Sequence, residues 1–121
     1  MVLDGFYEIS NTTINENDTV TVLKVNKDHD IYKGHFPGRP VTPGVVLMQL
    51  FKEEAERIFD KKLRLVRADN VKFTAVFDPT QDPELILESN LTETGEFIKL
   101  QGIAKNNHGI VLKISTLYQV I

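Results

Sequence analysis

The stretch that decides the fold is GHFPGRPVTPG at residues 34–44, which runs directly into the apolar segment VVLMQLF at residues 45–51. It contains three of the chain's five prolines, three of its seven glycines and one of its three histidines. Each proline fixes its own φ angle and pushes the preceding residue away from the helical region. The stretch therefore predicts a stiff, extended loop that ends where a helix begins.

The residues at the start of this helix predict a backbone N–H that could bind an oxygen atom of a ligand. We expect Thr42 at the N-cap and Pro43 at the first helical position, where the missing N–H removes no hydrogen bond. The first free helical N–H then belongs to Gly44. A glycine lets a ligand oxygen come close to that N–H, at the positive end of the helix dipole. The pattern predicts a donor for an oxyanion or a carbonyl oxygen.

The rest of the chain predicts one helix and several strands. The helix is expected over residues 43–59, and its first two turns, apolar apart from Gln49, are expected to be buried on every side. Alternating residues predict strands at 6–9, 19–25, 63–68, 71–77, 84–93, 96–104 and 110–120. Turn residues at 93–96 and 106–109 predict that hairpins link the last three. The sequence predicts a single α+β domain over residues 1–121, an antiparallel sheet wrapped around one long helix.

Composition excludes several classes of function. The longest apolar stretch, residues 45–51, is far shorter than the roughly 20 residues of a membrane span. A net charge of -3, with the basic residues scattered among acids, disfavours nucleic-acid binding. The chain has no cysteine, and its N-terminus carries acids where a secretory signal has basic and apolar residues. We therefore expect a cytoplasmic protein without membrane or nucleic-acid partners.

The motif HFPG-x-P-x-x-PGV at residues 35–45, followed by an apolar helix, resembles the active-site signature of a known family. That family is the hot-dog-fold 3-hydroxyacyl-[acyl-carrier-protein] dehydratases of fatty acid synthesis. A second stretch, DNVKF at residues 69–73 with Pro79 and Asp82 beyond it, is similar to the family's strand after the helix. The resemblance covers nearly the whole chain. It implies a hot-dog fold and removal of water from a 3-hydroxyacyl thioester to give the trans-2-enoyl thioester, without a cofactor.

The resemblance also implies which residues act. His35 is the base that takes a proton beside the thioester carbonyl, a task that suits a pKa near working pH. The Gly44 N–H polarises that carbonyl. In the family a glutamate or aspartate follows the histidine by fourteen residues, and this chain has Gln49 there. The substrate-binding residues expected in and after the motif are Phe36, Pro37, Gly38, Pro43 and Val45.

Gln49 has two interpretations. An amide donates a hydrogen bond to a departing hydroxyl but cannot release a proton at neutral pH. Gln49 either holds substrate or water opposite His35, or is a buried amide satisfied by neighbouring backbone. Loss of a general acid typically lowers a rate by about 10² to 10⁴. The candidate substitutes are Glu53, one turn beyond Gln49, and Asp28, His29 and Asp30 in the loop before the motif.

Three functional hypotheses stay open. The protein is a dehydratase, a hot-dog acyl thioesterase in which His35 and Gln49 activate water, or a non-catalytic acyl-binding subunit that needs a partner's carboxylate. The expected substrate is an acyl thioester of acyl carrier protein or coenzyme A. The resemblance implies at least a homodimer, because in the family the histidine of one protomer faces the helix of the other. The spacing of His29, Asp30 and His35 fits no metal-ligand pattern, so no metal site is expected.

Overall fold

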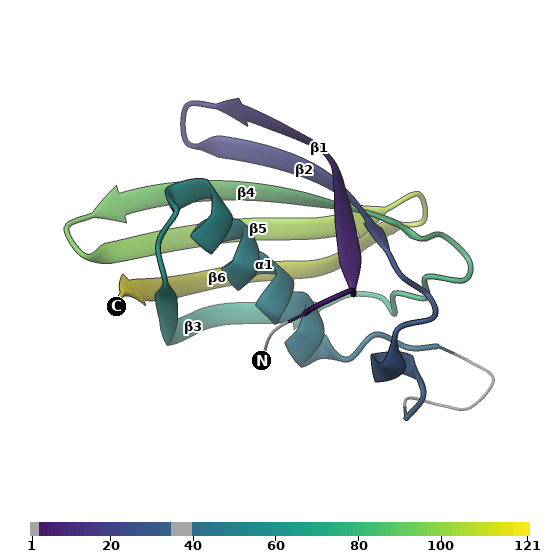
Figure 1. Ribbon diagram of the computed structural model, residues 1–121. Coiled ribbons are helices and arrows are strands. Elements are labelled where there is room, and N and C mark those ends of the chain that lie inside the picture. The colour runs from purple at the N-terminus through teal and green to yellow at the C-terminus, as the bar shows by residue number, and fades with distance from the viewer. Residues whose placement is uncertain (1–2, 35–39) are drawn as a thin grey trace.

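A computed structural model describes residues 3–34 and 40–121 of the chain. Six strands form one antiparallel sheet in the order β1-β2-β4-β5-β6-β3, and α1 (Gly44–Phe59) lies across one face of it (Figure 1). A single-turn helix, η1 (Asp30–Tyr32), precedes α1. The strands are β1 (Tyr7–Asn15), β2 (Asp18–Val25), β3 (Leu63–Phe73), β4 (Glu84–Thr94), β5 (Phe97–Asn106) and β6 (Gly109–Val120). A sheet around one central helix is the predicted α+β architecture, which the structure confirms.

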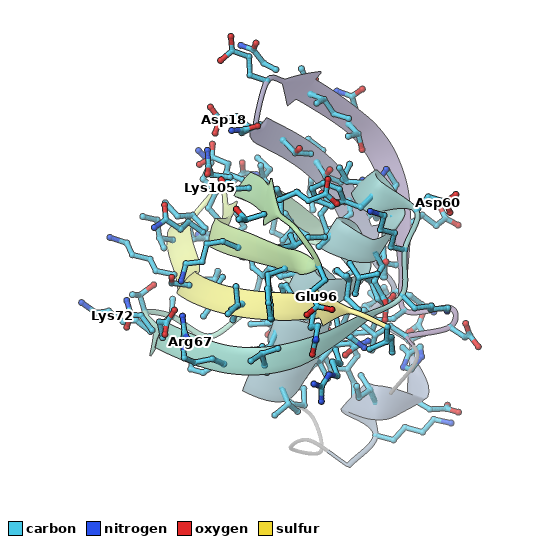
Figure 2. All side chains as sticks on the ribbon, turned by 90° about the vertical axis from the view of Figure 1, so that its left-hand side faces the viewer. Asp18, Asp60, Arg67, Lys72, Glu96 and Lys105 are labelled. Atoms are coloured by element: carbon cyan, nitrogen blue, oxygen red, sulfur yellow. The ribbon has the colours of Figure 1, made fainter. Side chains whose placement is uncertain are left out.

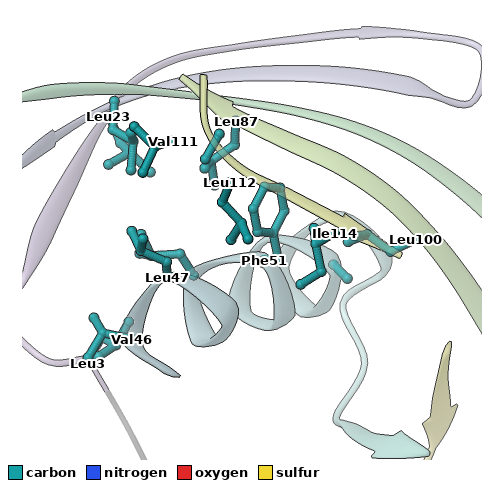
Figure 3. Close-up of a cluster of buried hydrophobic side chains, with 14 of the residues drawn as sticks. Leu3, Leu23, Val46, Leu47, Phe51, Leu87, Leu100, Val111, Leu112 and Ile114 are labelled. Carbon is teal, nitrogen blue, oxygen red and sulfur yellow. The ribbon is translucent and has the colours of Figure 1, made fainter. Parts of the chain in front are cut away.

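The core lies between α1 and the inner face of the sheet. Strand alternation turns every second residue inward, where Leu87, Leu100 and Leu112 are almost fully buried. Phe51 rises from α1 into this layer beside Leu112 and Ile114 (Figure 3). Each such side chain stabilises the fold by about 1.5–3 kcal/mol through burial. This packing fixes the helix on the sheet and therefore fixes the side of α1 that faces away from it.

Several predicted strand boundaries are wrong. Residues 63–68 and 71–77 were expected to be separate strands, but one strand, β3, spans Leu63–Phe73 and ends before the predicted end at residue 77. Its pairing with β6 shifts between Leu65 and Arg67 and again between Ala68 and Asn70. Such bulges insert an extra residue without ending the strand, so they interrupt the alternation in the sequence. The first strand was expected only over residues 6–9, but β1 spans Tyr7–Asn15. Backbone pairing with β2 keeps its polar second half in the strand, although the sequence there has no apolar alternation.

The predicted helix start is displaced by one residue. Pro43, not Thr42, occupies the N-cap with an extended backbone (φ -61°, ψ 142°), and Gly44 is the first helical residue. The Thr42 hydroxyl is hydrogen-bonded to the Tyr32 hydroxyl at 2.7 Å instead of capping the helix. Its N–H donates to the Phe77 carbonyl oxygen at 3.1 Å. A tertiary contact has replaced the local capping bond that the sequence favoured.

The first two turns of α1 are not buried on every side, which corrects a second expectation. Val46, Leu47 and Leu50 are buried against the sheet, but Val45 is 62% exposed. Gln49 is partly exposed. The apolar residues of this part of the helix therefore lie on two sides. One side packs in the core, and the other side lies outside it.

Strand β3 forms one edge of the sheet and carries apolar side chains that are open to solvent. Leu65, Val66 and Phe73 are 45%, 45% and 50% exposed. The outer face of the sheet is charged by contrast, and Figure 2 shows Lys72 and Lys105 extending away from it. In the part of the chain that the structure describes, no helix is both long and apolar enough to cross a membrane.

Candidate functional site

A cavity of about 350 Å³ lies beside the outward side of α1. Its volume is in the range of small-molecule pockets. Residues at helical spacing, i, i+3, i+4 and i+7, form one wall, and side chains of β3 and β6 form the other. The lining residues are Val45, Met48, Gln49, Lys52, Leu65 and Tyr118. This cavity explains why the first turns of α1 are apolar on the side away from the core.

A larger hollow of about 530 Å³ crosses the outer face of the sheet. Polar and charged residues such as Asp18, Glu88 and Lys113 line it. Among the predicted catalytic and substrate-binding residues that the structure describes, none contributes to its walls. The smaller cavity is therefore the better candidate for the functional site, because the predicted site residues Val45 and Gln49 both line it and its other walls are mainly apolar.

The amide of Gln49 is held by a side chain. Its Nε2 donates to Oε2 of Glu53 at 3.1 Å. The Tyr7 hydroxyl donates to Oε1 of Glu53 at 3.0 Å, and the Leu3 N–H donates to Oε2 at 3.3 Å. Both carboxylate oxygens of Glu53 thus already accept hydrogen bonds from the protein. This arrangement argues against Glu53 as the substitute acid.

Tyr7 is a permanent donor to this carboxylate. Burial raises the pKa of its hydroxyl, and the neighbouring negative charge of Glu53 raises it further. A raised pKa keeps the hydroxyl protonated across the physiological range. The Glu53 carboxylate is therefore held by a phenol that stays protonated near neutral pH.

Gly44 has a structural reason to be glycine. A Cβ atom there would lie 2.6 Å from Cζ of Phe73, closer than any normal contact. The ring of Phe73 thus occupies the side on which other residues carry their side chain. The Gly44 N–H lies in the first turn, where backbone donors have no partner within the helix. The predicted oxygen-binding donor is compatible with this geometry.

The segment that contains the HFPG motif starts and ends at anchored residues. Tyr32 and Thr42 join across it through their buried hydroxyl groups, 2.7 Å apart. The Tyr32 ring also stacks on Phe6 with a centroid separation of 6.0 Å. Burial raises the pKa of Tyr32 to about 12, so its hydroxyl stays protonated. His35, Phe36, Pro37 and Gly38 lie outside the described residues, and their roles stay predictions.

The loop residues proposed as substitutes have structural partners. Nδ1 of His29 accepts from the Ile31 N–H at 3.0 Å, so Nε2 carries the proton and donates to the Asp4 carbonyl oxygen at 2.9 Å. Asp30 pairs with Lys33 at 2.9 Å. Both ring nitrogens of His29 are engaged, which leaves neither for a metal. Among residues 3–34 and 40–121, no three His, Cys, Asp or Glu side chains are placed to hold a metal ion.

Several residues of the site were missed by sequence reasoning. Lys52 follows Gln49 by three residues, a helical spacing that places both on one face. Tyr7 lies 46 residues from Glu53 in the sequence, so no local signal connects them. Leu65 belongs to a strand whose pairing decides which way it faces.

Several solved structures share this fold. The dehydratase heterocomplex ApeI:P from Xenorhabdus doucetiae superposes with a TM-score of 0.73 and 17% identity, covering 93% of this chain and 96% of that one. A hypothetical thioesterase with coenzyme A from Streptococcus pneumoniae TIGR4 gives 0.67 and 14%, covering 95% and 85%. The putative thioesterase yhdA from Lactococcus lactis gives 0.69 and 9%, covering 100% and 97%. At these identities the likeness shows the hot-dog fold alone.

Sequence comparison is more specific. Among curated proteins, none matches the chain significantly. Residues 11–108 do match the profile of the ApeI-like family, described as ApeI dehydratase. The matched span contains the HFPG motif, all of α1 and strand β3, whose Leu65 lines the cavity. On that match, the chain belongs to the ApeI-like dehydratase family.

Proposed function

We propose that the protein is a 3-hydroxyacyl-thioester dehydratase that removes water to form a trans-2-enoyl thioester. The observation that carries the proposal is the position of Gln49. It follows the motif histidine by the fourteen residues typical of the dehydratases that the chain resembles, and it lines an apolar cavity beside α1. Membership of the ApeI-like family supports the same chemistry.

In the proposed reaction His35 takes a proton from C2 of the substrate. The electron pair of that bond forms the C2–C3 double bond, and the hydroxyl group leaves C3. The Gly44 N–H stabilises the negative charge that develops on the thioester oxygen. The Gln49 amide contacts the departing hydroxyl but has no proton to give. We propose that the proton taken by His35 completes the departing water, which balances the reaction without a second acid.

The walls of the cavity suit an acyl chain. Val45, Met48 and Leu65 offer apolar contact, whereas Lys52 is the charged residue among those lining it. We propose an acyl thioester of acyl carrier protein or coenzyme A as the substrate. Lys61, one of the basic residues that could meet an acidic carrier protein, pairs with Glu93 at 2.9 Å.

We also propose that a second copy of the chain completes the site. The apolar residues Leu65, Val66 and Phe73 on the β3 edge are about half exposed. An exposed apolar edge strand is a template for pairing with another strand. Leu65 belongs both to that edge and to the cavity, so pairing at β3 would cover the cavity opening.

Product analysis tests the proposal. Purified protein is incubated with a 3-hydroxyacyl thioester, and the ultraviolet absorbance of the conjugated enoyl thioester is followed. A parallel reaction with a thiol reagent detects free thiol. Enoyl product that disappears in a His35→Ala variant supports the dehydratase. Thiol release without enoyl product supports a thioesterase instead.

A third outcome favours the acyl-binding subunit. If neither product forms alone, a partner that supplies the missing carboxylate is required. The dehydratase from Xenorhabdus doucetiae with the same fold is a heterocomplex, which makes this arrangement worth testing. Dehydration that appears only on adding a second, carboxylate-bearing subunit would replace the proposal of an independent enzyme.

A further inference from the structure

The outer face of the sheet carries a groove that the proposed reaction does not use. Residues that pair across neighbouring strands share a face of the sheet, and one such row forms the floor of the groove. From β2 to β3 the row is Asp18, Asn90, Gln101, Ser115 and Asn70. All of them line the hollow of about 530 Å³ described above. At a strand spacing of about 4.8 Å, a groove across these strands is about 19 Å long.

The next outward rows border this floor on both sides. One row holds Ile103 and Lys113, which also line the hollow, and the opposite row holds Lys99 and Leu117. Lys113 and Leu117 lie on the same strand and are separated by about 13 Å, because a strand rises about 3.3 Å per residue. An α-helix with its side chains is about 10–12 Å across. The groove therefore has the width of one helix.

Charge divides the groove between its two ends. Asp18 and Glu88 line the end formed by β2 and β4, where Glu88 also pairs with Lys105 at 2.9 Å. At the β3 end the side chains around the floor are basic apart from Asp69, namely Arg67, Lys72, Lys99 and Lys113. In Figure 2 Asp18 lies at the top of the molecule, and Arg67 and Lys72 lie at the opposite end of the sheet. The groove is thus acidic at one end and basic at the other.

Lys72 and Lys113 have no acidic partner. They are direct partners in the pairing of β3 with β6, so their side chains leave the same face with Cβ atoms about 5 Å apart. Asp69 is occupied by Arg67 and Lys99. Within residues 3–34 and 40–121 neither lysine forms an ion pair. Like charges directly opposite each other destabilise a sheet, and a bound anionic group would remove this repulsion.

We propose that this groove is a docking surface for an amphipathic α-helix of a partner protein, whose acidic residues pair with Lys72 and Lys113. The helix dipole fixes the direction of the bound helix. Its negative C-terminal end lies over β3, and its positive N-terminal end lies over Asp18. Because α1 covers the other face of the sheet, this surface is separate from the acyl cavity and does not rest on the proposed function.

Other anionic partners fit the groove less well. No aromatic side chain lines the hollow, so the bases of a single-stranded nucleic acid have no stacking platform. The surface of a lipid bilayer would meet the two bordering rows and leave the polar floor unfilled. A helix fills the groove, and its polar side chains can bond the amide and hydroxyl groups of the floor.

The first test needs no partner and uses thermal melts of the free protein at low salt. Lys113→Gln removes one charge of the lysine pair, so we expect a melting point about 1–4 °C above the wild type. Lys72→Gln should do the same, and the double variant should gain less than the sum, because one substitution already ends the repulsion. Lys27→Gln, the same charge change in an exposed loop, is the control and leaves the melting point near the wild type. An unchanged or lower melting point in both lysine variants overturns the inference.

The second test is fluorescence anisotropy with a labelled, alanine-based peptide of about 14 residues, stapled as a helix about 21 Å long. Glutamates along one face of the peptide supply the acidic groups, and a second peptide has glutamine in their place. We expect the glutamate peptide to bind the wild type and Lys27→Gln alike, and to bind Lys72→Gln or Lys113→Gln about two- to fivefold more weakly. Failure of the glutamate peptide to bind, equal binding of the glutamine peptide, or unchanged affinity in both folded lysine variants overturns the inference.

Competition decides the class of partner. Oligothymidine and vesicles that contain phosphatidylglycerol are added to the complex at equal concentrations of negative charge. We expect neither to displace the glutamate peptide. Displacement by the oligonucleotide, or by the vesicles, replaces the helix with a nucleic acid or a membrane surface as the occupant and overturns the proposal.

Discussion

Replacing Gln49 by glutamate would place a carboxyl group where the resemblance to dehydratases of fatty acid synthesis leads us to expect one, next to an existing carboxylate. The Gln49 nitrogen lies 3.1 Å from a Glu53 oxygen, so Gln49→Glu places two carboxyl groups in contact. Two unit charges at this separation repel by about 1.3 kcal/mol in bulk water and about 5 kcal/mol at an effective dielectric constant of 20. The site is partly buried, which favours the larger value. One proton shared between the two groups removes the repulsion.

The pair therefore titrates as a unit, and one of its two pKa values is raised. A carboxyl group that keeps its proton near neutral pH is a general acid, so we expect dehydration of a 3-hydroxyacyl thioester to rise by about one to three powers of ten. Because this pKa is raised in the folded state, the folded protein binds more protons than the unfolded chain at pH values between the two pKa values. The contribution of the protonated pair to the stability of the protein is thus fully present below the unfolded pKa of about 4.3. It is lost as the pH rises through the folded pKa.

Two assays follow from this reasoning. Initial rates of enoyl formation give the change in activity, and thermal melts between pH 5 and 8 give the change in stability. The melting point of Gln49→Glu should fall further below the wild type as pH rises. In the double variant Gln49→Glu with Glu53→Gln, the repulsion is absent and this pH dependence disappears. A folded Gln49→Glu protein that gains no activity, and whose melting point parallels the wild type at every pH, would refute the argument.

Three further outcomes are expected. His35→Ala should abolish turnover while the melting point stays within a few degrees of the wild type, and unchanged turnover would show that the motif does not act in catalysis. Gly102→Ala places a Cβ 2.6 Å from the buried ring of Phe51, so overpacking should destabilise by about 1–3 kcal/mol and lower the melting point by about 4–12 °C. Gly34→Ala, with nothing within 4 Å, is its control and should leave the melting point nearly unchanged. Light scattering should show a dimer that Val66→Lys on the β3 edge dissociates, and a monomeric wild type at micromolar concentration would exclude the shared site.

Much of the fold was predictable because its signals are local. The apolar helix after the proline-rich loop and the alternating strands after it are encoded in neighbouring residues. The sequence misled where a distant contact overrode a local preference. Thr42 has the chemistry of an N-cap, but the Tyr32 hydroxyl is its partner. The gap expected after Ala68 is a bulge, because pairing with β6 holds β3 together across it.

The candidate site was predictable in part for the same reason. Counting fourteen residues from His35 identified Gln49, and helical spacing identified Glu53 as its neighbour. What Glu53 does could not be read from that spacing, because Tyr7 and the Leu3 N–H reach it from the start of the chain. Those contacts make both carboxylate oxygens of Glu53 hydrogen-bond acceptors.

The close approach of the Phe73 ring to Gly44 means that substitutions at these two residues depend on each other. The glycine belongs to the helix end where we propose that the thioester binds, and the ring belongs to the edge where we propose that a second copy pairs. A side chain at residue 44 must displace the ring, so a single substitution would disturb chemistry and assembly together. The compensated pair Gly44→Ala with Phe73→Ala frees the space that the new methyl group needs. Residues 44 and 73 should therefore be varied as one unit in any mutant library.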